Sequence, residues 1–342
     1  TEFLVDRSYA DRYNLIACAI GHHIMESRWL RDTTYLHQIL RTWYYGNDGQ
    51  AMTKMNKFSS WNPAAIYEMW KVQGDTTFML GLKPRLEEEY ARWERTNRLK
   101  NGLYWQEDVR DGMEESISGG RKKQYARPTI NSYMFGNAKA LAAMNQLTNE
   151  TIKASLYEQK ADTIRHLIET KLWNEDQLFF ETHRGDSSSN VREAIGYIPW
   201  YFNLPEMGSK YDVVWQQLLD EKGFSAPYGL TTAERRHPEF RSHGVGTCEW
   251  DGAIWPFATS QTLTALANYL NTQSTQNNLI NQVDLRNAFF RQMELYVESQ
   301  HHRGRPYIGE YLDETNGTWL MGDRERSRYY NHSTFNDLMI TG

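Results

Sequence analysis

Acidic side chains gather at residues 108–116, where the sequence reads DVRDGMEES. Glu114 follows Gly112 and the apolar Met113, and the glycine suits a tight turn that points one carboxylate inward. A carboxyl group beside an apolar wall is held protonated and can serve as a general acid. The turn alone does not decide between Glu114 and the other carboxylates of this stretch, among them Asp111. The alternative is a solvated acidic loop, which is the usual state of a cluster of charged residues.

A second acidic stretch lies at residues 309–317, with the sequence GEYLDETNG. Glu310 precedes the aromatic Tyr311, and Asn316-Gly317 ends the stretch in a turn. Two carboxylates that converge over an aromatic floor suit the hydrolysis of a glycosidic bond. One protonates the leaving oxygen, and the other activates water or attacks the anomeric carbon. The alternative is a plain surface loop, because distance along the chain does not measure distance in space.

A third stretch, residues 248–256 (CEWDGAIWP), combines aromatic and acidic side chains around a glycine. Trp250, Asp251 and Trp255 are the side chains expected of a sugar subsite, since tryptophan offers a flat apolar face and a carboxylate accepts hydrogen bonds from hydroxyl groups. The alternative is that Trp255-Pro256 only packs against the start of the helix that follows.

A fourth stretch, residues 26–32 (ESRWLRD), precedes a predicted helix. Arg28, Trp29 and Asp32 could hold sugar hydroxyl groups by paired hydrogen bonds, and Glu26 is a third candidate for a catalytic carboxylate. Charged residues at the start of a helix more commonly cap and solvate it, so the structural interpretation of Glu26 is equally well supported.

Other aromatic and polar side chains have the chemistry of sugar contacts. Trp61 and Trp105 are candidate stacking floors, although a tryptophan is as well suited to the core. The polar candidates for binding hydroxyl groups are Asn62, Arg127, Asn131 and His332. His301 and His302 are adjacent and have no third ligand at a suitable spacing, so we expect catalysis without a metal or any other cofactor.

The composition excludes several classes of protein. The chain has 342 residues with a formal net charge of −5, and it lacks runs of Lys and Arg, which argues against nucleic acid or an anionic membrane surface as the main partner. It contains no run of about 18 apolar residues that would span a bilayer. Two cysteines cannot build a disulfide framework. The 12 Trp and 21 Tyr residues suit stacking on hydroxylated ligands, a large interface or an aromatic core.

The apolar periodicity is helical along most of the chain. The predicted helices cover residues 35–43, 62–72, 130–147, 164–172, 213–219, 263–270 and 289–297. Strand signals are few, and residues 177–181 are the clearest of them. Long polar loops are expected at residues 101–127, 223–252 and 301–330, and long loops on a helical scaffold are commonly functional. We therefore expect one all-α domain over residues 1–342. Residues 335–342 read as the opening of a helix, which suggests a domain of a larger protein.

The order of these stretches resembles that of the (α/α)6-barrel glycoside hydrolases, in the group of trehalases, family 63 α-glucosidases and mannosylglycerate hydrolases. The matching segments are RWLRDTTY (28–35), DGMEES (111–116), WDGAIWP (250–256) and EYLDETNG (310–317), with Asn62-Pro63 at the family's Gln-Pro-Pro helix start. The likeness runs from residue 26 to residue 332. It is greatest to a bacterial branch that degrades polysaccharides.

The resemblance implies an (α/α)6 toroid in which Glu114 is the general acid, with Asp111 as the alternative, and Glu310 is the general base of an inverting hydrolase. The implied partner is an oligosaccharide or polysaccharide, and such polymers are met outside the cytoplasm, so we expect an extracytoplasmic location. Other classes stay open on this fold: a carbohydrate-binding barrel without catalysis, a lyase, or a glycan phosphorylase, for which Arg324, Arg326 and Arg328 are a weak hint.

Overall fold

The computed structural model describes residues 18–52, 54–206, 208–242, 248–272, 280–322 and 333–341. Within these ranges most of the ordered backbone is helical, and the strands are short and lie in the loops. None of the helices in these ranges has the length and apolar character needed to cross a bilayer.

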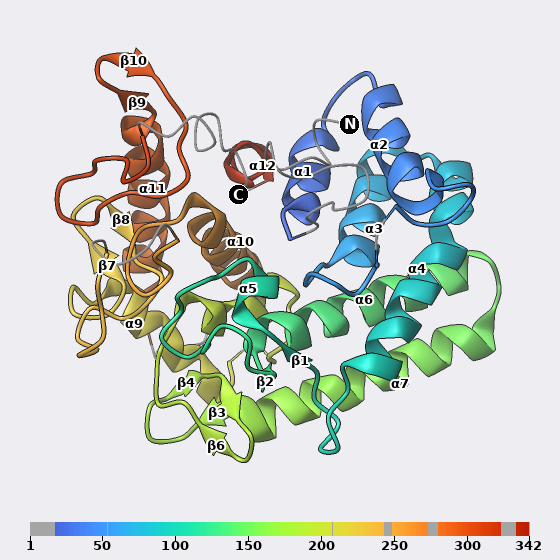
Figure 1. Cartoon of the computed structure of the whole chain (residues 1–342), viewed down its shortest axis with the longest axis horizontal. Helices are drawn as coiled ribbons and strands as arrows, with labels where there is room; N and C mark the ends of the chain where they lie inside the picture. The colour runs from blue at the N-terminus through green and yellow to red at the C-terminus, as the bar shows by residue number, and fades with distance from the viewer. Residues whose placement is uncertain are drawn as a thin grey trace.

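A closed ring of inner helices forms the centre of the molecule (Figure 1). In chain order they are α1 (Ile20–Ser27), α3 (Asn62–Gln73), α6 (Pro128–Leu147), α8 (Ile198–Tyr201), α10 (Pro256–Thr272) and α12 (Phe335–Thr341). Each inner helix contacts the next one, and α12 contacts α1. Helix α6 is buried on every side over its first half, as expected of a helix surrounded by protein.

Outer helices pack around this ring. They are α2 (Thr34–Tyr45), α4 (Thr76–Thr96), α7 (Thr151–Leu167), α9 (Trp215–Leu219) and α11 (Gln282–Ser299). Helix α7 runs along α6, α11 packs on α10, and α4 contacts both α3 and α6 (Figure 1). Inner and outer helices therefore alternate along the chain, which is the arrangement of an (α/α)6 toroid.

Local sequence signals explain where several helices begin and end. Helix α3 has Pro63 in its first turn and ends at Gly74, whose φ of 73° is left-handed. The carboxylate of Asp75 then accepts a hydrogen bond from the backbone N–H of Phe78 (2.9 Å) and caps α4. The predicted helices at 35–43, 62–72, 130–147, 263–270 and 289–297 are confirmed.

Two predicted helices are α-helical only in part. The prediction at 164–172 covers the end of α7 and a π-helix, η1 (Ile168–Leu172). The prediction at 213–219 covers the end of a 3₁₀-helix, η3 (Lys210–Val214), and then α9.

The strands belong to small sheets in the loops. Strands β3 (Trp173–Asn174) and β4 (Phe179–Phe180) form a hairpin, which confirms the strand predicted at 177–181. One sheet joins the loop before α6 to the loop before α8; its strands are β1 (Trp105–Gln106), β2 (Tyr125–Ala126), β5 (His183–Arg184) and β6 (Ser187–Ser188). The remaining pairs are β7 (Ser225–Ala226) with β8 (Gly229–Leu230) and β9 (His301–His302) with β10 (Arg305–Pro306).

Long loops lead into the inner helices, and short connections leave them. The loop before α6 contains the short helix α5 (Asp108–Asp111), and the loop before α8 contains η2 (Ala194–Tyr197). By contrast, Gly74 and Asp75 alone connect α3 to α4. The loops predicted at 101–127, 223–252 and 301–330 therefore lead to the N-terminal ends of α6, α10 and α12.

Candidate active site

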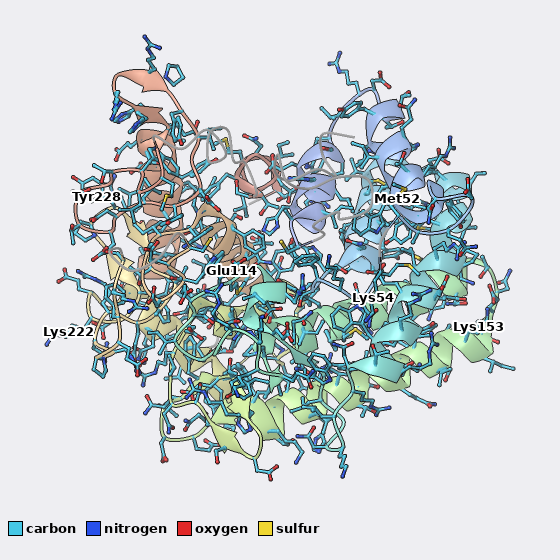
Figure 2. All side chains as sticks on the ribbon, in the orientation of Figure 1. Met52, Lys54, Glu114, Lys153, Lys222 and Tyr228 are labelled. Carbon is cyan, nitrogen blue, oxygen red and sulfur yellow. The ribbon has the colours of Figure 1, made fainter. Side chains whose placement is uncertain are left out.

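The loop that carries Glu114 turns sharply on both sides of it. Helix α5 ends at Asp111, Gly112 has a φ of 77°, and Glu115 has a φ of 64°. Between these left-handed residues, the side chain of Met113 is buried and that of Glu114 is half-buried. Glu114 lies near the middle of the molecule beside α5 (Figure 2). The turn predicted at the glycine therefore buries the methionine and leaves the glutamate at the surface of the loop.

Asp111 lies beneath this loop and is enclosed. Its carboxylate accepts hydrogen bonds from Arg127 Nε (2.6 Å) and Thr129 Oγ1 (2.5 Å), and also from the Ser59 hydroxyl. The Asp111 carboxylate is buried, ion-paired and multiply hydrogen-bonded, so it is not exposed to a substrate. The structure thus gives Asp111 a supporting role, in place of the alternative role as acid.

Arg127 was expected to contact sugar hydroxyl groups, but its guanidinium is buried under the loop. It lies among the charges of Asp111, Glu193 and Asp108, and it contacts Met113 Sδ at 4.0 Å. Asn131, the other polar candidate on α6, is also buried and bonds the backbone of Tyr104 in both directions, at 2.8 and 2.9 Å. These two predictions are corrected, since both side chains hold the loop against α6.

Glu193 is a member of this network that the sequence did not reveal. It lies just before η2, and Ser118 binds it through its hydroxyl and through its backbone N–H (3.3 Å). Burial raises the pKa of Glu193, while the nearby charge of Arg127 lowers it. Glu193 could have been identified from its position at the end of a long loop before an inner helix, where the other candidates also lie.

Glu310 begins a segment that is braced against the stretch at 248–256. Tyr311 Oη donates a hydrogen bond to Glu249 Oε2 (2.6 Å), and Leu312 pairs with Ile254 through two backbone hydrogen bonds of 3.0 and 2.9 Å. The Glu310 side chain is mostly buried. Glu249, which was not among the candidates, therefore links the two segments that flank the predicted base.

The aromatic side chains of these segments stack on one another. The ring of Trp255 lies 4.2 Å from that of Trp250 and 4.4 Å from that of Tyr311, centre to centre. All three rings are buried, and Trp255 Nε1 donates to the backbone carbonyl of Glu249 (2.9 Å). They form one stacked, buried group next to Glu310 in the chain, and their direct contact with sugar stays a prediction.

A cavity of about 370 Å³ connects the acid loop to the stretch at 248–256. One side is lined by residues of the 108–121 loop, including Glu115 and Ser116, and the other by residues including Arg241 and Asp251. Because the stretch at 248–256 pairs with the Glu310 segment, the loops of both predicted catalytic carboxylates border one region at the N-terminal ends of the inner helices.

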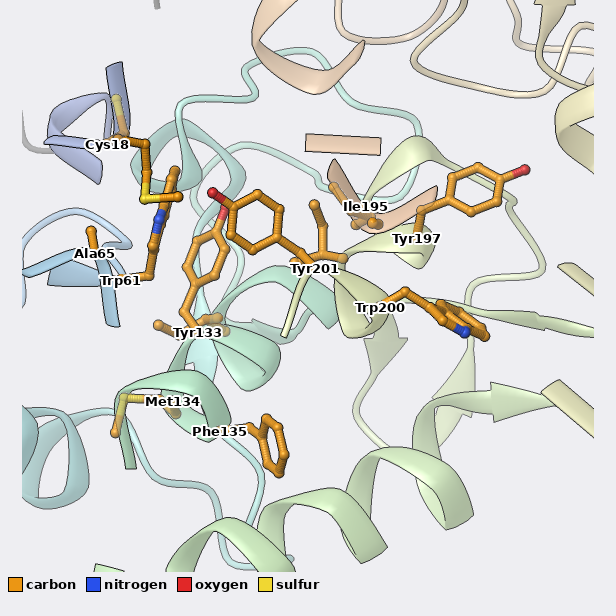
Figure 3. Packing of buried hydrophobic residues seen from close by; sticks show 14 of the residues in the cluster. Cys18, Trp61, Ala65, Tyr133, Met134, Phe135, Ile195, Tyr197, Trp200 and Tyr201 are labelled. Atoms are coloured by element: carbon orange, nitrogen blue, oxygen red, sulfur yellow. The ribbon is translucent and has the colours of Figure 1, made fainter. Parts of the chain in front are cut away.

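Trp61 and Asn62 lie at the start of α3, and both are buried. Trp61 contacts His22 and Tyr133, with ring centres 4.8 and 4.9 Å apart, and the ring of Tyr201 lies 5.8 Å from it (Figure 3). Trp61 thus packs in the centre of the ring, as the core interpretation expected. Trp105, on β1, is half-buried and stays a candidate floor.

The stretch at 26–32 lies at the opposite end of the inner helices. Arg28 follows the last turn of α1, and its carbonyl accepts a hydrogen bond from Gln73 Nε2 (3.2 Å), at the end of α3. Arg28 also lines a larger cavity, of about 640 Å³, together with Asn271 and Thr341 near the ends of α10 and α12. This stretch therefore lies away from the loops of Glu114 and Glu310, and its contact with sugar stays a prediction.

Each predicted site residue of this stretch has a structural partner instead. Arg28 and Trp29 both donate to Asp337 Oδ1, at 2.9 and 2.7 Å. Glu26 accepts hydrogen bonds from two backbone N–H groups in the first turn of α12, at 3.0 and 3.2 Å, so it caps that helix. Asp32 is exposed and accepts from the Thr34 N–H (2.9 Å) at the start of α2.

The remaining candidates give less information. His332, and with it Arg324, Arg326 and Arg328, lies outside the described residues. In the described part of the chain, no three His, Cys, Asp or Glu side chains are grouped so that they could hold a metal ion. The expectation of catalysis without a metal or cofactor stays a prediction.

Comparisons with known proteins concern the family and the fold of the chain. The family described as mannosylglycerate hydrolase MGH1-like glycoside hydrolase domain matches residues 12–333. No curated protein matches the chain. A solved chain named sialidase is 69% identical with a TM-score of 0.94, and the match covers 100% of this chain but 31% of that chain. This chain thus spans less than a third of that relative.

More distant structures share the fold. A GH63 mannosylglycerate hydrolase from Thermus thermophilus, solved in complex with glucose, has a TM-score of 0.72 at 13% identity, and the match covers 99% of this chain and 97% of that one. A D-mannose isomerase has a TM-score of 0.53 at 11% identity, with coverage of 95% and 86%. The predicted (α/α)6 toroid is confirmed. The chain belongs to the family described as mannosylglycerate hydrolase MGH1-like glycoside hydrolase domain.

Proposed function

We propose that this glycosidase removes terminal sugars from an oligosaccharide or polysaccharide by acid and base catalysis, with Glu114 as the acid and Glu310 as the base. The observation that supports the proposal is the arrangement of the two loops that carry these carboxylates. Their loops lead into the N-terminal ends of α6 and α12, and both border the stretch at 248–256.

In this mechanism Glu114 donates its proton to the glycosidic oxygen as the bond to the anomeric carbon breaks. Glu310 takes a proton from a water molecule that attacks the same carbon from the opposite face, so the anomeric configuration inverts. Asp111 and Arg127 hold the acid loop from below, and Glu249 and Tyr311 hold the base segment from the side. A rigid support of this kind lowers the reorganisation needed at the moment of reaction.

A location outside the cytoplasm is part of the proposal, because large glycans are met there. The relative named sialidase is much longer than this chain, which supports a role as one domain among several that act on a complex glycan. The name of that relative supports sialic acid as one member of a substrate panel. The guanidinium groups of Arg121 and Arg241 are already paired with carboxylates, which gives sialic acid no preference over neutral sugars.

The test is release of sugar from a broad panel of glycosides and oligosaccharides by wild type, Glu114→Ala and Glu310→Ala, with the anomer of the fresh product followed by NMR. The proposal is supported if wild type releases a sugar of inverted anomeric configuration and both folded variants lose this activity. Release that requires added phosphate would indicate a phosphorylase. A folded wild type that binds panel sugars without cleaving any would indicate a binding barrel.

A further inference from the structure

The cavity of about 370 Å³ is lined on one side by the residue that follows the proposed acid in the chain. Glu115 and Ser116, which line it, directly follow Glu114 in the chain. A general acid must contact the oxygen of the leaving group, so a cavity lined by the two residues that follow Glu114 in its loop is a candidate place for the leaving group. The residues of the 108–121 loop that line the cavity are Asp108, Glu115, Ser116, Ile117, Gly120 and Arg121, and those opposite are Pro238, Glu239, Phe240, Arg241 and Asp251.

An ion pair lies on each wall of this cavity. Arg121 pairs with Glu115 on the acid loop, and Arg241 pairs with Asp251 on the facing segment. Both arginine side chains are partly exposed, at 56% and 43%, so their remaining N–H groups are open to a ligand. An arginine can donate a hydrogen bond to one sugar hydroxyl while the adjacent carboxylate accepts a hydrogen bond from the neighbouring hydroxyl.

Asp251 provides an independent indication of a ligand. Its side chain is 3% exposed, one oxygen accepts from Arg241, and the other oxygen, Oδ1, has no hydrogen-bond partner among the described residues. A buried carboxylate oxygen without a partner costs free energy, and a donor supplied by a ligand would remove that cost. A sugar hydroxyl is such a donor.

We propose that this cavity is a leaving-group subsite that binds one neutral sugar unit of the substrate through the Asp251–Arg241 and Glu115–Arg121 pairs. The inference rests on the proposed function, since it needs Glu114 as the acid. A neutral unit fits because carboxylates line the cavity at four positions and guanidinium groups at only two, so a uronic acid would meet repulsion there. The enzyme therefore prefers an oligosaccharide to a glycoside with a small leaving group.

The test compares two substrates with the same terminal sugar: the oligosaccharide that wild type cleaves best in the panel, and the glycosyl fluoride of its terminal sugar. Fluoride is too small to occupy the subsite. For Asp251→Asn we expect the ratio of kcat/KM on the oligosaccharide to kcat/KM on the fluoride to fall about 10- to 100-fold, since a hydrogen bond to a charged group is lost. Arg121→Gln, an exposed position on the other wall, should lower the ratio several-fold.

Asp220→Asn is the matched control, because Asp220 forms an exposed ion pair with Arg236 in the same part of the chain but outside the cavity. It should leave the ratio unchanged. An unchanged ratio in both cavity variants would overturn the subsite while leaving the proposed function intact. If Glu114→Ala keeps full activity on the oligosaccharide, the proposed function fails first, and the subsite fails with it.

Discussion

The catalytic need for Glu114 should depend on the leaving group of the substrate, whereas the need for Glu310 should not. A general acid is required when the leaving oxygen must be protonated, and it is dispensable when the leaving group is fluoride. We expect Glu114→Ala to lose about 100- to 10,000-fold in kcat on the oligosaccharide but much less on the glycosyl fluoride. Glu310→Ala should lose activity on both, because each reaction needs an activated water. Steady-state kinetics on the two substrates measure this.

Glu107→Ala is a suitable control, since Glu107 lies in the same loop and its carboxylate forms a long ion pair with Arg110, at 4.0 Å. Its rates should match those of wild type on both substrates. Equal losses on both substrates in Glu114→Ala would assign the acid role to another group.

At the residue scale, the sequence could indicate which loops carry the chemistry but not which side chains face the substrate. Glu114 and Glu310 lie in loops at the expected end of the fold. Arg127 and Asn131 were assigned to substrate because polar residues in a sugar hydrolase suggest hydroxyl contacts. They are instead buried partners of Asp111 and Tyr104. A polar side chain at the start of an inner helix can point to either side, and only tertiary packing decides which.

At the scale of elements, the acid loop depends on one buried arginine. Arg127→Met would leave Asp111, Glu193 and Asp108 buried without their common cation. Removing one partner of a buried ion pair typically costs about 3–5 kcal/mol, so we expect the free energy of unfolding to fall by about that amount. Denaturant unfolding measures it. Arg291→Met, whose partners Glu294 and Glu298 are both exposed, should change it by less than about 1 kcal/mol.

Activity measurements on Arg127→Met show whether Arg127 holds Glu114 in place or only stabilises the fold. If Arg127 holds Glu114 in place, the folded fraction of Arg127→Met should lose more activity on the oligosaccharide than on the fluoride. Equal losses on the two substrates would reduce Arg127 to a purely structural residue.

Helix α4 contains a buried titratable group that couples its packing to pH. Glu89 accepts hydrogen bonds from Tyr44 Oη (2.8 Å) and Ser60 Oγ (2.7 Å), so it joins α4 to α2 and to the start of α3. Burial raises its pKa from 4.5 to about 7, against the lowering effect of these hydrogen bonds. The folded state therefore holds a proton that the unfolded state has lost, and the stability from this group is lost as the pH rises from 4.5 through 7.

Glu89→Gln keeps the shape and removes the titration. Relative to this variant, wild type should lose about 3 kcal/mol of stability across that interval. Thermal unfolding of both proteins between about pH 4 and pH 8 measures the difference, and parallel curves would contradict a raised pKa.

The helices themselves were largely predictable, because an apolar stripe of period 3.6 and proline at a first turn are local signals. The loop before α8 was not singled out, although it supplies Glu193. The stretch at 26–32 was assigned to substrate, but it lies at the end of the inner helices away from the loops of Glu114 and Glu310. Charged and aromatic residues before a helix look alike at both ends of a barrel, and the direction of each helix in the ring follows only from contacts distant in sequence.

At the scale of the whole molecule, this stretch closes the ring. The first inner helix, α1, meets the last, α12, through the buried pair of Arg28 and Asp337 and through the cap that Glu26 provides. Arg28 and Asp337 lie 309 positions apart in the sequence. Because α12 follows the loop that carries Glu310, the closure also determines where that loop ends.

This division of roles predicts that stability and catalysis respond separately to changes at the ring closure. Arg28→Leu should lower the free energy of unfolding by about 3–5 kcal/mol, since it leaves the buried Asp337 carboxylate without its cation. Asp337→Asn should lower it by less, because Arg28 keeps its ion pair with Glu68 at 3.7 Å. The double variant should lose less stability than the sum of the two single variants, because the two residues act as one pair.

The activity of these variants should change little. At a temperature where circular dichroism shows that each variant is fully folded, its kcat/KM on the oligosaccharide should stay within about threefold of wild type, because the pair lies at the opposite end of the inner helices from Glu114. A tenfold loss in the folded Arg28→Leu protein would instead place this stretch at the active site. The stabilising contacts of the ring and the reacting groups of its loops would then be parts of one unit.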